Sequence, residues 1–199
     1  FSVDLEGSGK DGLGYCTYDS NDEKYTFKVI KSVESPNDII VYPQSETNTF
    51  YFGDFLGEGG AQFMFRSKPT GNNVTLTLKK KIGPNNWLSV SKTVNKDSNI
   101  SVTDFNGNGK SDIHVVNGTT VDIYEYNAPT NSFEKILDSG TLATASAKDY
   151  FGDFNGDGKQ DYIRFKYGNW KLKMSKGNAY TDDIALPFIN SSTSSGEPM

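Results

Sequence analysis

The sequence predicts an all-β fold built from repeated four-stranded units, and two observations support this expectation. The chain of 199 residues is 13% aromatic and contains 20 glycines, a composition that favours strands and turns over helices. A segment in which an aspartate is followed by alternating polar residues and glycines also recurs. Its first aspartate falls at steps of 50, 50 and 49 residues, at Asp4, Asp54, Asp104 and Asp153. A nearly constant step of this kind indicates a repeat architecture.

Each unit contains four strand-like segments. In the second unit, residues 49–53 lead into the aspartate loop and residues 61–67 leave it. A third segment alternates polar and apolar residues, and a fourth follows it. The third segments are 25–30, 74–79, 121–126 and 170–175, and the fourth are 38–43, 87–92, 133–138 and 183–188. Four strands in about fifty residues predict a β-propeller in which each unit forms one four-stranded antiparallel blade.

The repeat also predicts the domain organisation. We expect one propeller domain over residues 1–189, with blades at about 1–48, 49–98, 99–147 and 148–189. Residues 190–199 are polar and are expected to form a linker or tail. Four blades fit a closed four-blade ring or a segment of a larger ring. Neither end of the sequence resembles a natural terminus, which favours the segment.

The fourth aspartate loop has the side chains of a calcium site. Oxygen-bearing residues occupy its positions 1, 3, 5 and 9, namely Asp153, Asn155, Asp157 and Asp161. Gly158 at position 6 permits a sharp turn, and Lys159 at position 7 offers its backbone carbonyl. Several oxygens converging on one point suit a hard cation, and Ca²⁺ fits better than zinc, which prefers Cys and His, or magnesium, which requires a strict octahedron.

The other three loops match this pattern to different degrees. The third is complete, with Asp104, Asn106, Asn108, Asp112 and the Lys110 carbonyl. The first offers Asp4, Glu6, Ser8 and Asp11, of which Ser8 is a weak ligand. The second has Leu56 at position 3, which cannot ligate, so we expect no metal there. Ligand charge and count predict that calcium affinity falls from the fourth loop to the third, the first and the second.

The loops could also be EF-hand loops or acidic turns without a metal. An EF-hand loop opens in the same way, but it needs glutamate at position 12, where this chain has Tyr15, Val115 and Arg164 in the first, third and fourth loops. A strand also follows each loop where an EF-hand needs a helix. The second interpretation is an acidic turn whose side chains bond their own backbone without a metal. It is preferred for the second loop and is as good as the metal interpretation for the first.

These loops resemble the FG-GAP repeat, also called the VCBS or integrin-α-like repeat, over residues 1 to about 189. The Phe-Gly pair stands at 52–53 and 151–152 and is replaced at 2–3 and 102–103. The resemblance implies a β-propeller with calcium-binding loops, and it assigns the ligands of the third and fourth loops to the positions given above. It also implies a secreted, extracellular or cell-surface protein, since such repeats occur in adhesion receptors, lectins, polysaccharide-degrading enzymes and large bacterial toxins.

Composition narrows the functional classes. The net charge of −5 and isoelectric point near 4.9 come without a basic stripe, which argues against nucleic acid as a partner. No stretch of 18 apolar residues is present, so we expect no membrane insertion. His114 and Cys16 are the only residues of their types and lie in different blades, so the sequence proposes no nucleophile–base pair. We therefore expect a protein that is not an enzyme.

The sequence thus predicts a calcium-binding propeller module that binds carbohydrate or protein, or serves as a scaffold. One alternative is a propeller segment of a large secreted bacterial toxin, with a catalytic domain elsewhere on the parent chain. An enzyme acting on polysaccharides is less favoured. Four aromatic residues have two candidate roles: their rings could stack on a bound sugar, or they could pack between the blades, and packing is the preferred role. They are Trp87, Tyr167, Trp170 and Tyr180.

Overall fold

A computed structural model describes residues 2–31, 36–84, 86–141, 148–166 and 169–186. In these ranges the regular elements are strands, in four antiparallel sheets of four strands each. Within each sheet the strands follow chain order, as expected for propeller blades. No helix in the described ranges is long and apolar enough to cross a membrane. The expected tail at 190–199 lies outside the described residues.

The sheets follow the predicted units. Blade one contains β1 (Ser2–Val3), β2 (Gly12–Asp19), β3 (Lys24–Ile30) and β4 (Ile39–Val41). Blade two contains β5 (Phe50–Gly53), β6 (Gln62–Arg66), β7 (Asn73–Gly83) and β8 (Asn86–Asn95). Blade three contains β9 (Asn99–Thr103), β10 (Asp112–Asn117), β11 (Thr120–Asn127) and β12 (Ser132–Thr141). Blade four contains β13 (Lys148–Gly152), β14 (Asp161–Lys166), β15 (Asn169–Lys173) and β16 (Ile184–Ala185).

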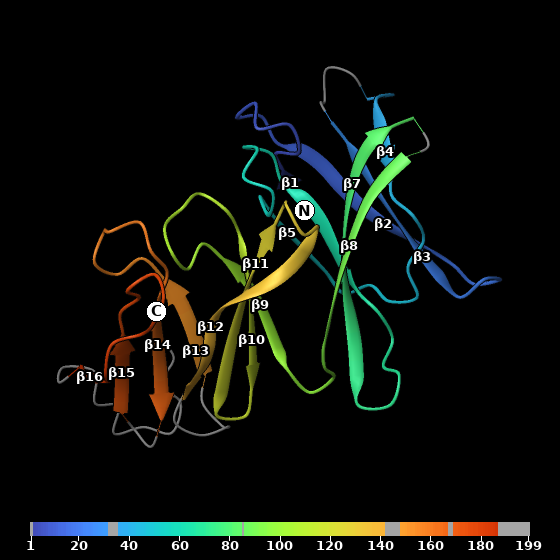
Figure 1. Cartoon of the computed structure of the whole chain (residues 1–199). Helices are drawn as coiled ribbons and strands as arrows, with labels where there is room; N and C mark the ends of the chain where they lie inside the picture. The colour runs from blue at the N-terminus through green and yellow to red at the C-terminus, as the bar shows by residue number, and fades with distance from the viewer. Residues whose placement is uncertain (1, 32–35, 85, 142–147, 167–168, 187–199) are drawn as a thin grey trace.

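The blades stand side by side in chain order (Figure 1). Three apolar clusters fill the spaces between consecutive sheets: Phe27 and Phe63 belong to the cluster between blades one and two, Leu76 and Ile113 to the next, and Ile123 and Tyr162 to the last. None of these clusters of described residues joins blade one to blade four. The described blades therefore form an open row, which corresponds to a segment of a ring.

Position 2 of the second and third aspartate loops helps to hold the row together, because its side chain packs toward the following blade. Phe55 and Phe105 are completely buried, and their rings contact Phe133 and Tyr180 at centroid distances of 6.1 and 5.1 Å. The equivalent Phe154 of blade four is 49% exposed. The same loop position is thus fully buried in blades two and three, partly buried at Leu5 in blade one, and exposed in blade four.

The opposite end of the row also exposes apolar side chains. Phe27 and Val29 of β3 face the blade-one/blade-two cluster, so their neighbours in sequence face outward. The pairs Leu13–Ile30 and Lys28–Val41 place Leu13 and Val41 on this outer face, and they are 52% and 50% exposed. Neighbouring exposed apolar side chains on a sheet face are typical of a surface that contacts another structural unit.

These two environments give a matched test of the packing. Phe105→Ala should lower the free energy of unfolding by about 3–5 kcal/mol, because it empties a filled site between two blades. Phe154→Ala, at the same loop position, should lower it by less than about 1 kcal/mol, since half of that ring already meets solvent. Urea denaturation followed by tryptophan fluorescence measures both. Equal losses would contradict the assignment of the fourth blade to the end of the row.

Candidate metal-binding loops and the adjoining groove

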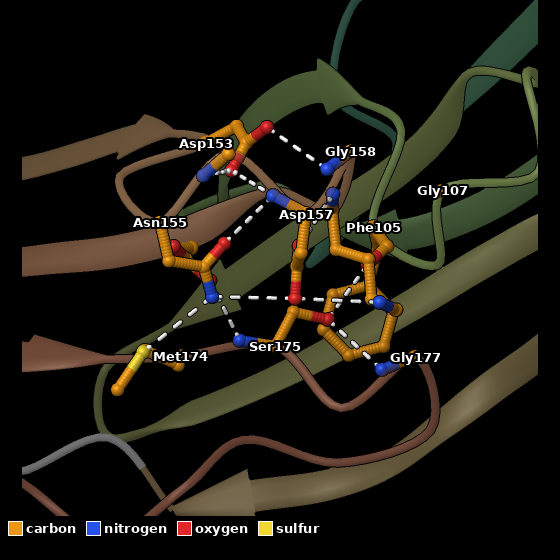
Figure 2. Close-up of polar contacts among 12 residues, drawn as sticks. Phe105, Gly107, Asp153, Asn155, Asp157, Gly158, Met174, Ser175 and Gly177 are labelled. Atoms are coloured by element: carbon orange, nitrogen blue, oxygen red, sulfur yellow. Dashed lines mark hydrogen bonds and ion pairs between the residues drawn. The ribbon is translucent and has the colours of Figure 1, made fainter.

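Each aspartate loop connects the first two strands of its blade, and the first aspartate shapes it. In the fourth loop, Asp153 Oδ1 accepts a hydrogen bond from the Asp157 amide at 3.1 Å, and Oδ2 accepts one from the Gly158 amide at 2.9 Å (Figure 2). Asp4, Asp54 and Asp104 accept the equivalent bonds from positions 5 and 6 of their loops. This backbone bonding by an aspartate is the turn chemistry that the metal-free interpretation describes.

Glycine is required at two positions of the loop. Gly158 at position 6 has φ of 82°, as expected from the sequence, and Gly156 at position 4 has φ of 76°. The other three loops repeat both left-handed glycines. A side chain at either position would strain the backbone. The loop therefore keeps one curled shape in all four blades.

Backbone hydrogen bonds join each loop to the next. The carbonyl of the first aspartate accepts a bond from the amide at position 8 of the following loop, and this contact recurs between all consecutive blades. The pairs are Asp4 with Ala61 at 2.8 Å, Asp54 with Ser111 at 2.9 Å, and Asp104 with Gln160 at 3.1 Å. The loops thus form a continuous ladder along the row.

The remaining polar groups of the fourth loop are largely paired inside the protein. Asn155 Oδ1 accepts from the Asp157 amide, and Asp157 Oδ1 accepts from the Lys159 amide, both at 2.9 Å. The Lys159 amide, together with its ammonium and the Asn155 amide, lowers the pKa of Asp157. Buried Asp161 accepts bonds from the Phe154 amide at 3.0 Å and the Ser175 amide at 2.8 Å. The partner Ser175 lies 14 residues further along the chain, and no loop motif identifies it.

The third loop differs at its ninth residue. Asp112 is fully buried, and its Oδ2 accepts from the Phe105 amide at 2.9 Å, but its Oδ1 has no hydrogen-bond partner. Burial, with the nearby carboxylates of Glu125 and Asp104, raises the pKa of Asp112 to about 7. Glu125, on β11, was not identified from the sequence. An unpaired buried carboxylate oxygen is costly, and a cation is one group that would satisfy it.

The structure changes the expectation for the first loop. The strand pairs Gly53–Gln62, Thr103–Asp112 and Gly152–Asp161 each end at loop position 9, and the matching pair in blade one is Val3–Gly12. Gly12 therefore stands where the other loops have Asp or Gln, and Asp11 lies one residue earlier. Counting from Asp4 gives the same alignment, in which Asp11 is position 8 and not the expected ninth-position ligand.

The first two loops contain cationic side chains from their own blade. Lys31 Nζ lies 2.8 Å from Glu6 Oε1, and the hydrogen bond to Glu6 raises the pKa of Lys31. Lys80 forms an ion pair with Glu58 of the second loop. In that loop the Gln62 side-chain amide also donates to Asp54 Oδ1 at 3.4 Å. The loop motif does not include either lysine, because both lie about 20 residues after their loops.

The fit of these loops to calcium follows from their donor groups. Within the described ranges, no three Asp, Glu, His or Cys side chains already gather into a metal cluster. The third and fourth loops nevertheless supply carboxylate, amide and carbonyl oxygens with lone pairs to spare, and Asp112 has an unpaired oxygen. These two loops fit a calcium ion in their donor chemistry. The second loop does not fit, because Leu56 brings no oxygen and Gln62 points its amide donor at Asp54.

Residues considered for catalysis or sugar stacking mostly belong to the core. His114 is completely buried, its Nε2 lies 2.8 Å from Thr103 Oγ1, and burial lowers its pKa to about 3. Trp170 is 3% exposed. Trp87 packs against Tyr42, and Tyr180 packs against Phe105. Tyr167 lies outside the described residues.

A groove of about 430 Å³ lies between blades one and two, beside their loops. Its walls combine apolar side chains, such as Ile39 and Tyr42, with charged ones, such as Asp38 and Lys79. Tyr42 is 5% exposed, and its burial raises the pKa of its hydroxyl. A groove of this size with a few polar groups suits a small polar ligand such as one or two sugar rings. Nothing in the sequence indicated it, because its walls come from two blades.

Comparisons with known proteins agree with this architecture. Residues 104–164, which include the third and fourth loops, match the FG-GAP-like repeat. The fold is similar to that of a lectin from Agrocybe aegerita described as recognising non-reducing terminal N-acetylglucosamine, with a TM-score of 0.62 and 14% identity. The match covers 96% of this chain and 51% of the lectin, so the chain spans about half of that protein's length.

A second structure, the Tc holotoxin pore of Photorhabdus luminescens, matches with a TM-score of 0.40 and 14% identity over 94% of this chain and 12% of the toxin chain. Among curated proteins, none matches the sequence. The repeat match and the four sheets lead to the same identification. The chain carries an FG-GAP-like repeat at residues 104–164, within an all-β fold of four-stranded antiparallel propeller blades.

Proposed function

We propose that this chain is a non-enzymatic, calcium-stiffened propeller module of a secreted or cell-surface protein, and that it binds carbohydrate. The observation that carries the proposal is the ladder of aspartate loops, in which each loop is bonded to its neighbour. A cation held by a loop would neutralise its carboxylates and rigidify the junction between two blades. The residues that would hold it are Asp104, Asn106, Asn108, Lys110 and Asp112 in the third loop and Asp153, Asn155, Asp157, Lys159 and Asp161 in the fourth.

The carbohydrate part of the proposal rests on the groove between blades one and two. Its mixture of charged side chains and partly apolar walls is of the kind that fixes the orientation of a polar ligand. The lectin of similar fold is described as recognising a sugar, which makes glycans the first ligand class to test.

A second candidate is a propeller section of a longer chain, such as a secreted bacterial toxin with its catalytic domain elsewhere. The uncovered outer face of blade one and the exposed Phe154 favour a chain that contributes blades to a larger assembly. The two candidates are compatible, because a sugar-binding ring and a scaffold ring use the same blades.

Calcium should raise the melting temperature. A loop with a dissociation constant of about 10⁻⁴ M adds about 1.4 kcal/mol at millimolar free Ca²⁺. Two such loops should shift the midpoint by about 5–10 °C between chelator and calcium. Thermal melts followed by circular dichroism measure the shift, and calorimetric titration counts the sites.

Three equivalent substitutions separate metal binding from loop structure. Asp104→Ala and Asp153→Ala should each remove about half of the calcium-dependent shift. Asp54→Ala removes the same backbone bonds in the second loop, so it should lower stability in chelator but leave the calcium shift unchanged. If Asp54→Ala abolishes the shift as completely as the other two, the calcium assignment is wrong.

The groove is tested with a glycan array, followed by calorimetry on any glycan that binds. Asp38→Ala should weaken binding at least about 10-fold, because a ligand hydroxyl loses a charged acceptor. The matched control is Asp97→Ala, since Asp97 also lies beside a lysine but outside the groove. Binding that both variants leave intact would move the sugar site elsewhere. Release of reducing sugar from the bound glycans would contradict the non-enzymatic assignment.

A further inference from the structure

Each aspartate loop has one neighbour on the third strand of its own blade or on the residue directly after that strand. The second and third strands pair at Leu13–Ile30, Phe63–Lys79, Ile113–Tyr124 and Tyr162–Lys173. In each blade, the next residue after that pair on the third strand lies beside position 9 of the loop. We call these four the cross-strand residues: Lys31, Lys80, Glu125 and Met174. They differ in charge although the loops beside them share one shape.

In blades one and two the cross-strand residue brings a positive charge to the loop. Lys31 Nζ bonds Glu6 at loop position 3, and it lies 3.5 Å from Asp38 as well. Lys80 pairs with Glu58 at loop position 5. Positions 3 and 5 are those that would face a metal, so an ammonium group of the protein already neutralises the carboxylate there.

In blade three the cross-strand residue is an acid. Glu125 Oε2 accepts from the side-chain amides of Asn106 at 2.9 Å and Asn108 at 2.6 Å. Lys110 is the neighbouring cation, with its Nζ 3.5 Å from Glu125 Oε1. The loop also holds Asp104 and the buried Asp112, whose Oδ1 has no partner. The charges of Glu125 and Asp104 both act on Asp112, and among the described residues the Oδ1 of Asp112 is unpaired.

In blade four the cross-strand residue carries no charge. The thioether of Met174 lies 3.5 Å from Asn155 Nδ2, as Figure 2 shows. Both oxygens of Asp161 are already bonded to backbone amides. The fourth loop has three carboxylates of its own, as many as the third has together with Glu125, but its ninth residue is satisfied without a cation.

We propose that the cross-strand residue decides which loops take a divalent cation. Lys31 and Lys80 act as built-in cations that replace the metal in the first two loops, whereas Glu125 adds a carboxylate outside the loop motif and makes the third loop the tightest calcium site. This inference rests on the proposed function and refines it. It reverses the order expected from the loop sequences, in which the fourth loop came first.

The test is a Ca²⁺ titration followed by NMR, in which the backbone amide signals of Gly109 and Gly158 report the third and fourth sites separately. In the unmodified protein, the Gly109 signal should saturate at the lower calcium concentration. Glu125→Gln should weaken the third site about 10-fold, the scale on which ligand charge tunes calcium loops, and leave the fourth site unchanged. Glu134→Gln is the matched control, because Glu134 also accepts an Asn side-chain amide in the same blade but lies on β12.

The reciprocal variant does not depend on the stability of Glu125→Gln. Met174→Glu places an acid beside the fourth loop, and it should tighten the fourth calcium site about 10-fold.

Lys31→Glu should make the Gly9 signal of the first loop respond to calcium. Lys24→Glu is the matched control, because it makes the same charge change at the far end of β3, and it should produce no response of Gly9.

The outcomes separate this inference from the proposed function. Calcium binding at Gly109 and Gly158 that is unaffected by Glu125→Gln and Met174→Glu would overturn the role of the cross-strand residue and leave the calcium module standing. No calcium response of either glycine up to about 10 mM would overturn both proposals, since extracellular modules bind at about 10⁻⁴–10⁻³ M. A first loop that binds calcium with Lys31 in place would refute the built-in cation.

Discussion

The structure depends on one contact that recurs at every junction between blades: the carbonyl of a loop's first aspartate accepts a hydrogen bond from the next loop. The side chain of the same aspartate curls its own loop through two backbone amides. One residue therefore sets the shape of a loop and fixes the position of the following blade. Because a sheet with two apolar faces needs neighbours to cover them, this contact aligns the surfaces that the apolar clusters then fill. The close approach also explains the glycine at loop position 4, since a Cβ on Gly7 would lie 2.6 Å from the Gly59 carbonyl oxygen.

Much of the fold follows from the sequence because its determinants are local. The period of the aspartate loops and the alternation within the third strands identify the blades, and glycine at position 6 follows from the turn it must make. The parts that were missed depend on contacts between distant residues. Lys31, Lys80 and Glu125 reach their loops from another strand, and Ser175 both donates to Asp161 and bonds the Phe105 carbonyl of the preceding blade. The ninth position of the first loop is different, because counting from Asp4 already places Gly12 there and the pair Val3–Gly12 agrees with that count.

The two ends of the row show what a blade lacks when no neighbour follows. In blades two and three, position 2 of the loop is a buried aromatic ring, and in blade four the same position is the half-exposed Phe154. On the other end, Leu13 and Val41 lie on the outer face of blade one, where the interior blades are covered. The two end faces differ in kind: blade four exposes the Phe154 ring, and blade one exposes apolar side chains on its outer sheet face. Apolar side chains like those that join the inner blades are thus exposed on both end faces of the row.

Metal loading and blade packing are coupled through the same residues. In the third loop, Asp104 contributes its side chain to the loop and its carbonyl to Gln160 of the fourth, while Phe105 and Asp112 bond each other and pack against blade four. A cation on the Asp104 and Asp112 carboxylates would therefore stabilise the junction between blades three and four as well as the loop itself. At the junction between blades one and two, Lys31 and Lys80 pair with the loop glutamates, and Phe27, Phe63 and Tyr42 fill the interface. The groove lies beside this junction, whereas under the proposed function calcium would stabilise the junctions in the half of the chain where the loop motif is complete.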